Sequence, residues 1–395
     1  MTRPELLVVG GGPAGAALAA MAAANGVTTL VIERDRFPRD KVCGEFVSAE
    51  GCAVLARLGL LPKLAAQGAM PMDACLLADG KGRSVEAPLP DLPRAGRTAL
   101  GITRAVLDEI LLRHAASCGA SVREQTIATS PFLEDGRVTG VVTRPSDAGG
   151  ADETIKATFV VAADGRRSML QRALHPTIGD PMTTSSRSWF GFSAHFPDRT
   201  QGLSRRIELF VFEGGYAGLG PVEGGRLDLA LIARVDALNA CGNSPQRLFE
   251  ERMLGNPLLV ERLGNDAPCS RWRSIGPLRF NVRMPASHGA ILLGDAAGTI
   301  DPFSGEGMSN ALRGAELALP FVMDALEAGG LTEAKARAWS SRWRSAFAPV
   351  TRRVRLLGTI FQHPRPASLA MSLLHLPQGA RMLPSLVAAT RTGSS

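Results

Sequence analysis

Glycines at a fixed spacing follow the first apolar run of the chain. Gly10, Gly12 and Gly15 come directly after the apolar residues 6–9 and directly before the alanine-rich stretch 16–25. In a strand–turn–helix unit the first glycine permits a tight turn, the second lets the backbone approach a pyrophosphate, and the third lets the helix pack closely on the strand. The free N–H groups at the start of the helix then face the phosphates.

An acidic residue completes this unit. A second apolar run, 28–32, ends at Glu33, about 20 residues beyond the glycine turn, where a carboxylate accepts hydrogen bonds from a ribose. An acid rather than an arginine at this position disfavours a 2′-phosphate. The N-terminus is therefore predicted to bind a dinucleotide, either FAD or NAD.

Two later segments place polar residues at the ends of apolar strands. Residues 159–163 lead into Asp164-Gly165, and residues 290–293 lead into Gly294-Asp295, followed by the turn 305–308 at the start of a helix. Ligands bind at the carboxyl ends of the strands in open α/β sheets, and a carboxylate there can accept hydrogen bonds from hydroxyl groups. The start of the helix offers unpaired N–H groups and the positive end of the helix dipole.

These segments resemble the DG and GD fingerprints of FAD-dependent oxidoreductases of the p-hydroxybenzoate hydroxylase and geranylgeranyl reductase superfamily. The resemblance extends over about residues 4–345, and the motifs occur in the family's order. It implies that Asp295 contacts the ribityl stem of the flavin and that residues 305–308 face flavin N1 and the C2 carbonyl, where the helix dipole raises the reduction potential. It also implies that Asp164 holds the loop near the pyrophosphate, although Asp164 could instead cap the helix that starts near Ser168.

An arginine precedes a predicted amphipathic helix. Arg104 comes just before the apolar stripe of Val106, Leu107, Ile110 and Leu111. In the resembled family such an arginine contacts an FAD phosphate, which suits the forked donors of guanidinium; a surface salt bridge is the alternative. The residues that we expect to bind FAD are Gly10, Gly12, Pro13, Ala14, Gly15, Glu33, Arg34, Cys43, Arg104, Asp164, Gly165, Gly294, Asp295, Pro302, Gly305, Gly307 and Met308.

The electron donor follows from the number of dinucleotide fingerprints. The sequence contains one such fingerprint, so it offers no second Rossmann domain for a tightly bound nicotinamide. We therefore expect NAD(P)H to visit transiently, or a separate reductase to supply electrons.

Four residues are candidates for the chemistry. Cys43 lies in Lys41-Val42-Cys43-Gly44-Glu45, which resembles the Cys-Gly motif that approaches the flavin in geranylgeranyl reductases. A small buried cysteine without a catalytic role is the alternative. Glu45, His195 and Tyr216 are candidates for a general base or for orienting a substrate.

The segment 216–221 departs from two family patterns. Prenyl reductases carry Tyr-x-Trp-x-Phe-Pro and flavin halogenases carry Trp-x-Trp-x-Ile-Pro where this chain has Tyr216-Ala-Gly-Leu-Gly-Pro. Gly218 and Gly220 replace the larger residues, so we expect a wider pocket. The missing tryptophans disfavour a halogenase.

The elements that must position these residues suggest an α/β plus α+β chain. We expect a Rossmann-type FAD-binding domain, a second and mainly antiparallel β-sheet domain for the substrate, and a C-terminal helical segment. The predicted bounds are 1–70, 100–175 and 283–345 for the first, 71–99 and 176–282 for the second, and 346–395 for the third, which five prolines divide into short helices.

The second domain is predicted from a hairpin and three strands. The hairpin spans 73–86 and the strands span 188–196, 206–212 and 226–235. Some aromatic residues of this sheet should line the substrate pocket, while most fill the core of the sheet itself; they are Trp189, Phe190, Phe192, Phe210 and Phe212.

Charge is distributed unevenly along the 395 residues. The net charge is +7, but residues 331–395 carry ten basic residues and one acid, so the remainder has a net charge of −2. This composition gives no support to nucleic-acid binding. The basic segment could contact an acidic carrier protein or an anionic membrane surface, or it could consist of solvated arginines on ordinary helices.

The six cysteines include no Cys-x-x-Cys pair and no cluster with zinc spacing. We therefore expect no metal site and a cytoplasmic protein, which could also associate with a membrane surface.

Three functions are compatible with the sequence. We favour an FAD-dependent monooxygenase that uses NAD(P)H and O2 on a hydrophobic aromatic or polyketide-like molecule. The alternative is a reductase of carbon–carbon double bonds that resembles the geranylgeranyl reductases. A third possibility is that either reaction occurs on a substrate tethered to a carrier protein that docks on the basic segment.

Overall fold

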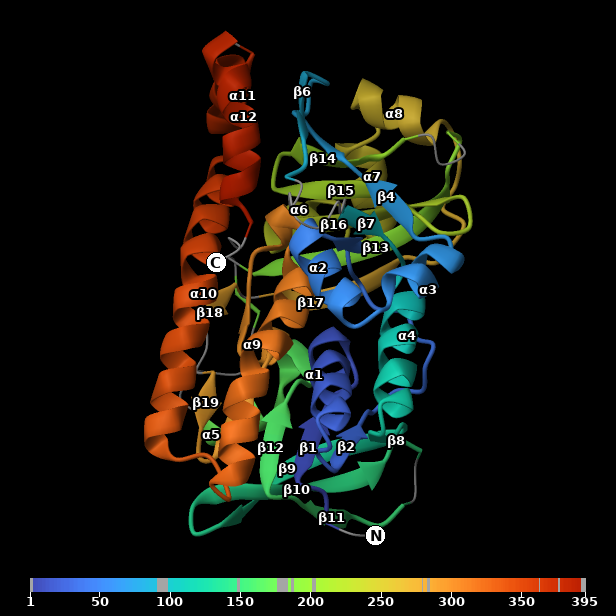
Figure 1. The fold of residues 1–395 in the computed structure, drawn as a ribbon. Coiled ribbons are helices and arrows are strands. Elements are labelled where there is room, and N and C mark those ends of the chain that lie inside the picture. The colour runs from blue at the N-terminus through green and yellow to red at the C-terminus, as the bar shows by residue number, and fades with distance from the viewer. Residues whose placement is uncertain are drawn as a thin grey trace.

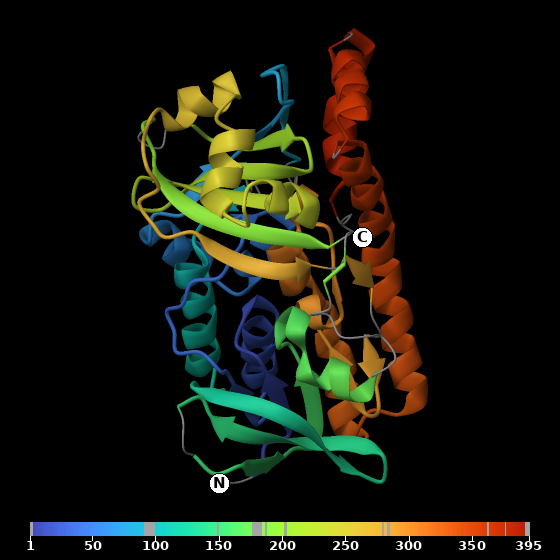
Figure 2. The same cartoon turned by 180° about the vertical axis from the view of Figure 1, so that it is seen from behind.

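The computed structural model describes residues 3–90, 99–147, 150–175, 184–185, 188–200, 204–278, 280–282, 285–361, 363–375 and 377–391. Two large sheets lie toward opposite ends of an elongated molecule, and a long C-terminal helix runs beside both of them (Figures 1 and 2). The predicted fold class, with a Rossmann-type sheet, a separate antiparallel sheet and a helical C-terminal segment, is confirmed.

The first sheet has six strands in the order β19-β20-β12-β1-β2-β8. All its neighbours are parallel except the short β19, which is antiparallel to β20. Strands β1, β2, β12 and β20 are buried along their whole length, as expected for a parallel sheet covered on both faces. The strands are β1 (Leu6–Val9), β2 (Thr29–Ile32), β8 (Ser121–Arg123), β12 (Phe159–Ala162), β19 (Ala286–Ser287) and β20 (Ala290–Leu292).

Helices and a β-meander pack on this sheet. Helix α1 contacts both α4 and α9, while strands β9 and β10 of the meander contact β2 and β12 (Figure 1). The predicted helix at Arg104 is α4, and the predicted helix after the turn 305–308 is α9. The elements are α1 (Pro13–Ala24), α4 (Arg104–Ser117), α9 (Gly307–Glu327), β9 (Thr126–Glu134), β10 (Arg137–Pro145) and β11 (Glu153–Lys156).

The second sheet has seven strands in the order β17-β13-β16-β15-β14-β5-β6. Its neighbours are antiparallel except β14 and β5, which are parallel. The expected hairpin and three strands are confirmed. The strands are β5 (Ala74–Ala78), β6 (Ser84–Pro88), β13 (Trp189–Pro197), β14 (Arg206–Phe212), β15 (Gly215–Val222), β16 (Arg226–Arg234) and β17 (Arg273–Leu278).

Two strands of this sheet, β15 and β17, are absent from the sequence prediction. Strand β15 contains Gly215, Gly218, Gly220 and Pro221, residues with low β propensity. It forms because it pairs along its whole length with β14 and β16. Three short helices and the aromatic core of the sheet pack together; they are α6 (Val235–Ala240), α7 (Pro245–Arg252) and α8 (Pro257–Leu263).

Short elements lie between the two sheets. A three-stranded sheet with the order β3-β7-β4 and the two-stranded pair β18-β21 connect the halves of the molecule. The strands are β3 (Phe46–Val47), β4 (Met70–Met72), β7 (Ala99–Gly101), β18 (Asn281–Val282) and β21 (Gly298–Thr299). The helices here are α2 (Ala49–Arg57) and α3 (Leu61–Ala66), and the 3₁₀ turns are η1 (Gly165–Arg167), η3 (Gly294–Ala296) and η4 (Pro302–Ser304). Helix α5 (Met169–Leu174) instead contacts the meander strand β9.

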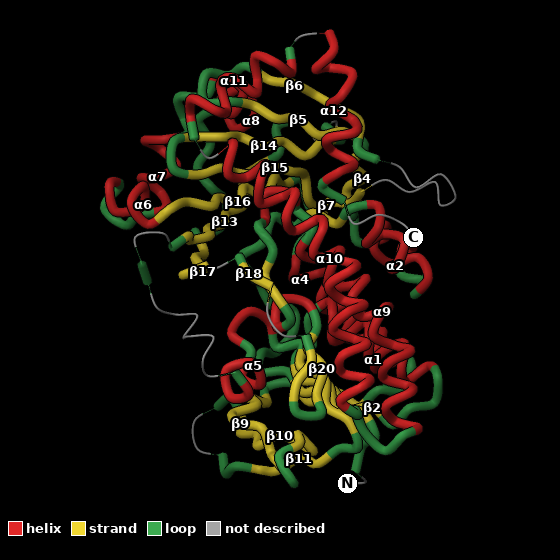
Figure 3. The backbone as a smooth tube through the Cα atoms, turned by 90° about the vertical axis from the view of Figure 1, so that its left-hand side faces the viewer, coloured by secondary structure: helices red, strands yellow, loops and turns green. Residues whose placement is uncertain are grey.

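The C-terminal segment differs from the prediction of short helices beginning at 346. Helix α10 (Glu333–Phe361) is continuous through Pro349, and only α11 (Pro364–Leu374) and α12 (Pro377–Ala389) are short (Figure 3). A buried stripe on α10, with Trp339, Trp343 and Phe347, packs against the core on the side of α9. This packing outweighs the backbone hydrogen bond that proline removes.

The division into domains stays a prediction. Its boundary at 345/346 falls inside α10 and its boundary at 99/100 falls inside β7. Residues 91–98 and 176–183, which the prediction gives to the substrate domain, lie outside the described residues. Among the helices that the structure describes, none is long and apolar enough to cross a membrane.

Candidate active site

A cavity of about 850 Å³ extends between the two sheets. At one end it is lined by the glycine turn before α1, by the loop 40–45 and by the residues that follow β12 and β20. At the other end it is lined by apolar side chains of the second sheet and of the C-terminal helices. We call these parts the polar end and the apolar end of the cavity.

The glycine turn faces the polar end. Gly12 lines the cavity, and a Cβ atom placed there would have only the guanidinium groups of Arg39 and Arg104 nearby, at 3.8 and 3.9 Å. Gly10 has a φ of +105°, and a Cβ at Gly15 would lie 1.9 Å from the Gly10 carbonyl oxygen. The turn is thus open where a phosphate is expected and closed where helix and strand must touch.

Glu33 lies behind the glycine turn. Its side chain is buried, and its two carboxylate oxygens accept hydrogen bonds from the backbone N–H groups of Gly11 and Asp35, at 2.7 and 3.0 Å. Gly10, Gly15 and Glu33 do not line the cavity, whereas the other residues predicted to bind FAD do. The contact of Glu33 with a ribose stays a prediction.

Arg104 is held at the polar end by a buried carboxylate. Its Nε and Nη2 donate to Asp108 at 2.8 and 2.6 Å, and Arg39 also pairs with Asp108 at 3.1 Å. Arg104 is 5% exposed, so the alternative of a surface salt bridge is wrong. The two guanidinium groups lie beside Gly12, where an anionic diphosphate would find cationic donors.

Two other acids line the polar end. Asp164 accepts a hydrogen bond from the Met169 N–H at 2.7 Å, so it supports the start of α5 together with the cap residue Ser168. Its second oxygen is buried without a hydrogen-bond partner among the described residues, and burial raises its pKa. Both proposed roles of Asp164 are therefore compatible with the structure. Asp295 lies in the turn η3, directly after β20.

The start of α9 also opens on the cavity. Gly307 and Met308 line it, and no side chain caps the first turn of the helix. Its free N–H groups and positive dipole end can face a group that becomes negative on reduction. The glycine turn, the guanidinium pair, the unpartnered Asp164 oxygen and this helix end fit the diphosphate, ribityl and flavin parts of FAD.

The comparison with protein families agrees with this geometry. Residues 3–319 match the family model described as "FAD binding domain". The chain belongs to this FAD-binding family. It is an FAD-dependent oxidoreductase, as its motifs predict.

Among relatives, the chain is 29% identical over 376 residues to a menaquinone reductase of Mycolicibacterium smegmatis, with 91% of this chain and 85% of the relative covered. It is 26% identical over 359 residues to a digeranylgeranylglycerophospholipid reductase of Methanosarcina mazei, with 86% and 80% covered.

Solved structures share the fold. The flavin-dependent brominase Bmp2 has a TM-score of 0.82 at 17% identity, covering 99% of this chain and 95% of that chain. PqsL of Pseudomonas aeruginosa, described as "a probable FAD-dependent monooxygenase", has a TM-score of 0.74 at 17% identity, covering 93% and 99%. A geranylgeranyl bacteriochlorophyll reductase-like protein of Thermoplasma acidophilum has a TM-score of 0.78 at 18% identity, covering 98% and 96%.

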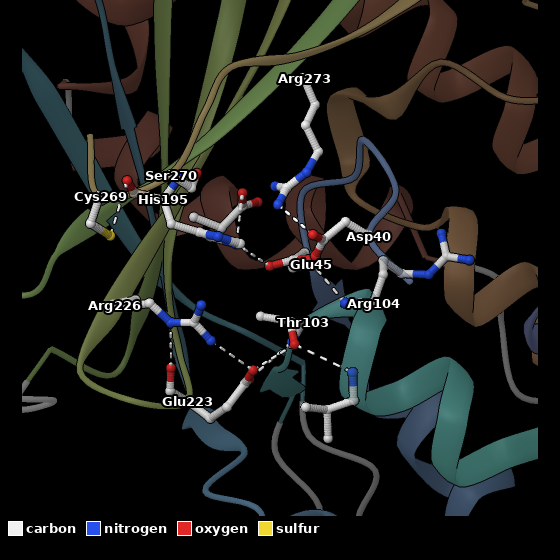
Figure 4. A network of polar contacts seen from close by, with 12 residues as sticks. Asp40, Glu45, Thr103, Arg104, His195, Glu223, Arg226, Cys269, Ser270 and Arg273 are labelled. Atoms are coloured by element: carbon white, nitrogen blue, oxygen red, sulfur yellow. Dashed lines mark hydrogen bonds and ion pairs between the residues drawn. The ribbon is translucent and has the colours of Figure 1, made fainter. Parts of the chain in front are cut away.

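Within this FAD-binding chain, the structure brings Glu45 and His195 together. Glu45 lines the cavity, and its Oε2 lies 2.8 Å from His195 Nε2, while its Oε1 accepts from the Arg104 N–H at 2.9 Å. Figure 4 shows His195, on β13, pointing toward Glu45 in the loop before β3. Glu45 has a φ of +46°, a strained conformation for a residue other than glycine.

Asp228 is a site residue that the sequence analysis missed. It pairs with His195 across β13 and β16, and its Oδ1 lies 3.8 Å from His195 Nε2. Burial, and then the charge of Glu45, raise the pKa of Asp228 well above its ordinary value. A single acid in the otherwise apolar strand 227–233 was the signal that could have identified it.

The other two catalytic candidates hold their protons. Cys43 lines the cavity, and burial raises the pKa of its thiol. Tyr216 lines it too, but its hydroxyl donates to Asp301 Oδ1 at 2.6 Å, and burial and this carboxylate raise the pKa of the phenol well above its ordinary value. Tyr216 thus suits orienting the Asp301–Pro302 turn better than taking up a proton.

The aromatic residues and the glycines of the pocket differ from expectation in part. Phe190 and Phe192 line the cavity, whereas Phe210 and Phe212 pack in the core of the sheet. Gly218 opens on the cavity with nothing within 4 Å of an added Cβ. Gly220 does not widen it, because Ile207 and Met72 fill the space beside it, at 2.9 and 3.1 Å from an added Cβ.

The C-terminal segment reaches the site through Arg391. This arginine is 8% exposed, forms an ion pair with the buried Glu306, and donates to the Ser304 carbonyl at 3.2 Å. Its guanidinium also lies over the Phe46 ring. Arg391 is therefore not one of the solvated arginines considered for the basic segment.

Proposed function

We propose that this FAD-dependent oxidoreductase saturates carbon–carbon double bonds in an isoprenoid chain. The apolar end of the cavity carries the proposal. It is lined by Leu77 and Val85 of the second sheet and by Leu357, Leu374 and Leu386 of the C-terminal helices. An apolar lining supplied by both the second sheet and the C-terminal helices suits a large alkenyl chain. The two relatives named as reductases support the same choice.

The chain's residues have distinct tasks in such a reaction. Bound FAD would supply a hydride to one alkene carbon, and a transient NAD(P)H would restore the reduced cofactor. Gly12, Arg39 and Arg104 would hold the diphosphate. The apolar lining excludes water from the reacting carbons, and Glu45 is an acid that reaches the cavity wall.

A hydrophobic substrate of this kind would come from a membrane, and we propose that the C-terminal helices contact its surface. Leu369 and Leu373 on α11 are 63% and 54% exposed, one helical turn apart. Exposed arginines lie on the neighbouring helices, including Arg352 on α10 and Arg381 on α12. Apolar side chains beside basic ones are typical of helices that lie on anionic bilayers.

Sedimentation with vesicles tests this contact. The protein should bind vesicles of phosphatidylcholine and phosphatidylglycerol more strongly than vesicles of phosphatidylcholine alone, and added salt should weaken the binding. Leu369→Glu with Leu373→Glu should weaken it about tenfold, because each change removes an inserted side chain. The matched control is Leu133→Glu, at an exposed leucine of β9. Equal binding by all variants, or none by the wild type, would reject the contact.

Anaerobic turnover tests the proposed reaction. The holoenzyme is reduced with dithionite without oxygen and mixed with geranylgeraniol, and the product is analysed by mass spectrometry. A gain of two hydrogen atoms with simultaneous oxidation of the flavin is expected. Oxidation of the flavin only after oxygen is admitted, with an oxygen atom in the product, would contradict the reductase.

The monooxygenase that the sequence favours is the second candidate. Gly218 supports it, because the open space at this position leaves room beside the cavity for a compact aromatic ring. The test is oxygen-dependent: a transient flavin absorbance after reduced enzyme meets oxygen, together with NAD(P)H oxidation that an aromatic ligand accelerates. Both tests can be made on one preparation of the reduced enzyme.

A further inference from the structure

Three titratable side chains meet behind the cavity wall. Glu45 Oε2, His195 Nε2 and a carboxylate oxygen of Asp228 all lie within 4.8 Å of one another. All three residues are at most 3% exposed. They come from the loop before β3 and from the adjacent strands β13 and β16, so the position of each one is set by a different element.

The hydrogen bonding of the three groups is unequal. Glu45 is satisfied by His195 and by the backbone of Arg104. Neither carboxylate oxygen of Asp228 has a hydrogen-bond partner among the described residues. A buried carboxylate left in this way holds its charge only at high cost. Two acids this close to each other cannot readily both be ionised, so the cluster stores a proton.

Other charged groups around the cluster do not neutralise it directly. Arg273, on β17, lowers the pKa of Asp228 by its charge, but its own guanidinium pairs with Asp40 at 2.6 Å. Arg104 pairs with Asp108. The thiol of Cys43 also interacts with Glu45 and Asp228. The network around Glu45 is visible in Figure 4.

We propose that Glu45, His195 and Asp228 form a proton-delivery cluster whose outlet into the cavity is Glu45. Of the three residues only Glu45 lines the cavity. His195 Nε2 faces both carboxylates, at 2.8 Å from Glu45 and 3.8 Å from Asp228. A proton held by Asp228 can therefore reach Glu45 through a single nitrogen.

The balance of the reaction shows why such a cluster is needed. The use of the stored proton in catalysis rests on the proposed function. Saturation of a double bond adds a hydride to one carbon, which oxidises the reduced flavin, and a proton to the other carbon. The proton held by Asp228 passes through His195 Nε2 to the Glu45 carboxylate, and Glu45 then gives that proton to the carbon and is a carboxylate again. Solvent restores the cluster before the next turnover. Glu45 is the catalytic residue here, and His195 and Asp228 act through it.

Infrared spectroscopy tests the stored proton without any substrate. In the oxidised holoenzyme at neutral pH, the carbonyl stretch of a protonated carboxyl group should be present and should shift in D2O. The difference spectrum between wild type and Asp228→Asn should show the loss of one such band, separate from the bands of other buried acids such as Asp164, whereas Glu208→Gln should show no loss. Glu208 is the matched control because it is a buried carboxylate of the same sheet, paired with Arg206 and Arg262. A wild-type spectrum without any such band, or a difference spectrum in which Asp228→Asn loses none, would overturn the cluster.

Single-turnover reduction of geranylgeraniol by the dithionite-reduced enzyme tests delivery. Glu45→Gln keeps the acceptor for the Arg104 N–H but has no acidic proton, and should slow saturation by about 100-fold. Asp228→Asn should slow it by about tenfold and alter its pH profile. Glu208→Gln should change neither. Unchanged rates and pH profiles in both cluster variants would overturn the proposal.

Two further results separate this inference from the proposed function. A stoichiometric divalent metal in the purified protein would overturn the cluster, because a cation would occupy the lone pairs that must carry the proton. If wild-type enzyme saturates no isoprenoid probe while the infrared band behaves as expected, the proposed reaction fails and the stored proton stands. Delivery of that proton to an alkene would then be rejected.

Discussion

The polar end of the cavity, which we call the FAD cleft, and the proton cluster of Glu45, His195 and Asp228 are built in different ways. In the cleft, Gly12, Asp164 and Asp295 each lie two or three residues beyond the end of a strand of the first sheet. The carboxyl ends of parallel strands meet at one edge, so short local motifs are sufficient to assemble the site. In the cluster, Glu45 and His195 are 150 residues apart and Asp228 meets His195 only through strand pairing. No local motif links them.

The difference also concerns charge. The cleft gathers cationic groups around a place for an anionic ligand, with Arg104 and Arg39 sharing the buried Asp108. The cluster gathers two acids and an imidazole with no cation in direct contact among the described residues. The first arrangement binds a charged group, whereas the second holds a proton. The following predictions test this contrast.

Gly12→Val should have the largest effect and should be confined to the cleft. A side chain would occupy the open space beside Arg104 and Arg39, so we expect FAD affinity to fall on the order of 1000-fold because the phosphate is displaced. Flavin absorbance of the purified protein measures the loss, and circular dichroism checks the fold. Gly255→Ala is the control, since a Cβ there meets nothing within 4 Å. A yellow, stoichiometric Gly12→Val protein would contradict the assigned cleft.

Arg391→Met should show that the C-terminal segment stabilises the cleft. Without the guanidinium, the buried Glu306 loses its ion-pair partner, which should cost about 3 kcal/mol in the free energy of unfolding. Denaturant unfolding of the holoprotein measures the change. Arg353→Met, at an exposed position of α10, should change it by less than about 0.5 kcal/mol. Equal losses in the two variants would mean that the ion pair contributes nothing.

Gly218→Leu should act on substrate and leave the cleft unaffected. The new side chain enters open cavity space, so FAD content should stay normal while KM for geranylgeraniol rises by about tenfold through lost room for the chain. Steady-state kinetics with Gly218→Ala as a smaller step measures the trend. An unchanged KM with leucine would place the substrate away from β15.

Asp228→Asn should have the smallest effect, about 1 kcal/mol on stability, and the effect should depend on pH. Because the folded-state pKa of Asp228 is raised, the native protein binds a proton that the unfolded chain has released. Stability therefore falls as pH rises from the ordinary pKa of an aspartate toward the raised value. Asparagine does not titrate, so the variant lacks this loss of stability. The stability of the variant relative to the wild type should therefore be higher at neutral pH than near pH 4. Thermal unfolding across this range measures the difference, and parallel curves for both proteins would contradict a proton on Asp228.

Much of the fold and of the cleft could be predicted from the sequence. The apolar runs at 6–9, 159–163 and 290–293 contain buried parallel strands, and Gly12, Asp164 and Asp295 after them line the cavity. The prediction missed β15 because glycine has little strand propensity of its own, and it divided α10 at Pro349 because proline removes a hydrogen bond. In both cases the decisive energy came from neighbouring elements.

The sequence identified several residues of the candidate site but not how they are arranged in space. Glu45 and His195 were each identified as candidates, but their contact at 2.8 Å was not. Asp228 and the ion pair of Glu306 with Arg391 were missed, since nothing local marks a residue whose partner lies across a sheet or at the end of the chain.

The amino-acid sequence by itself determined the FAD-binding family, the parallel sheet and the edge where the cofactor motifs meet. These features rest on short patterns whose geometry the backbone dictates within a few residues. Only the tertiary structure decided that Gly218 opens on the cavity while the space beside Gly220 is filled, and that α10 continues through its proline. It also decided that Glu45, His195 and Asp228 meet within 4.8 Å. Those outcomes depend on which surfaces are buried together, and burial is set by contacts between elements far apart in the chain.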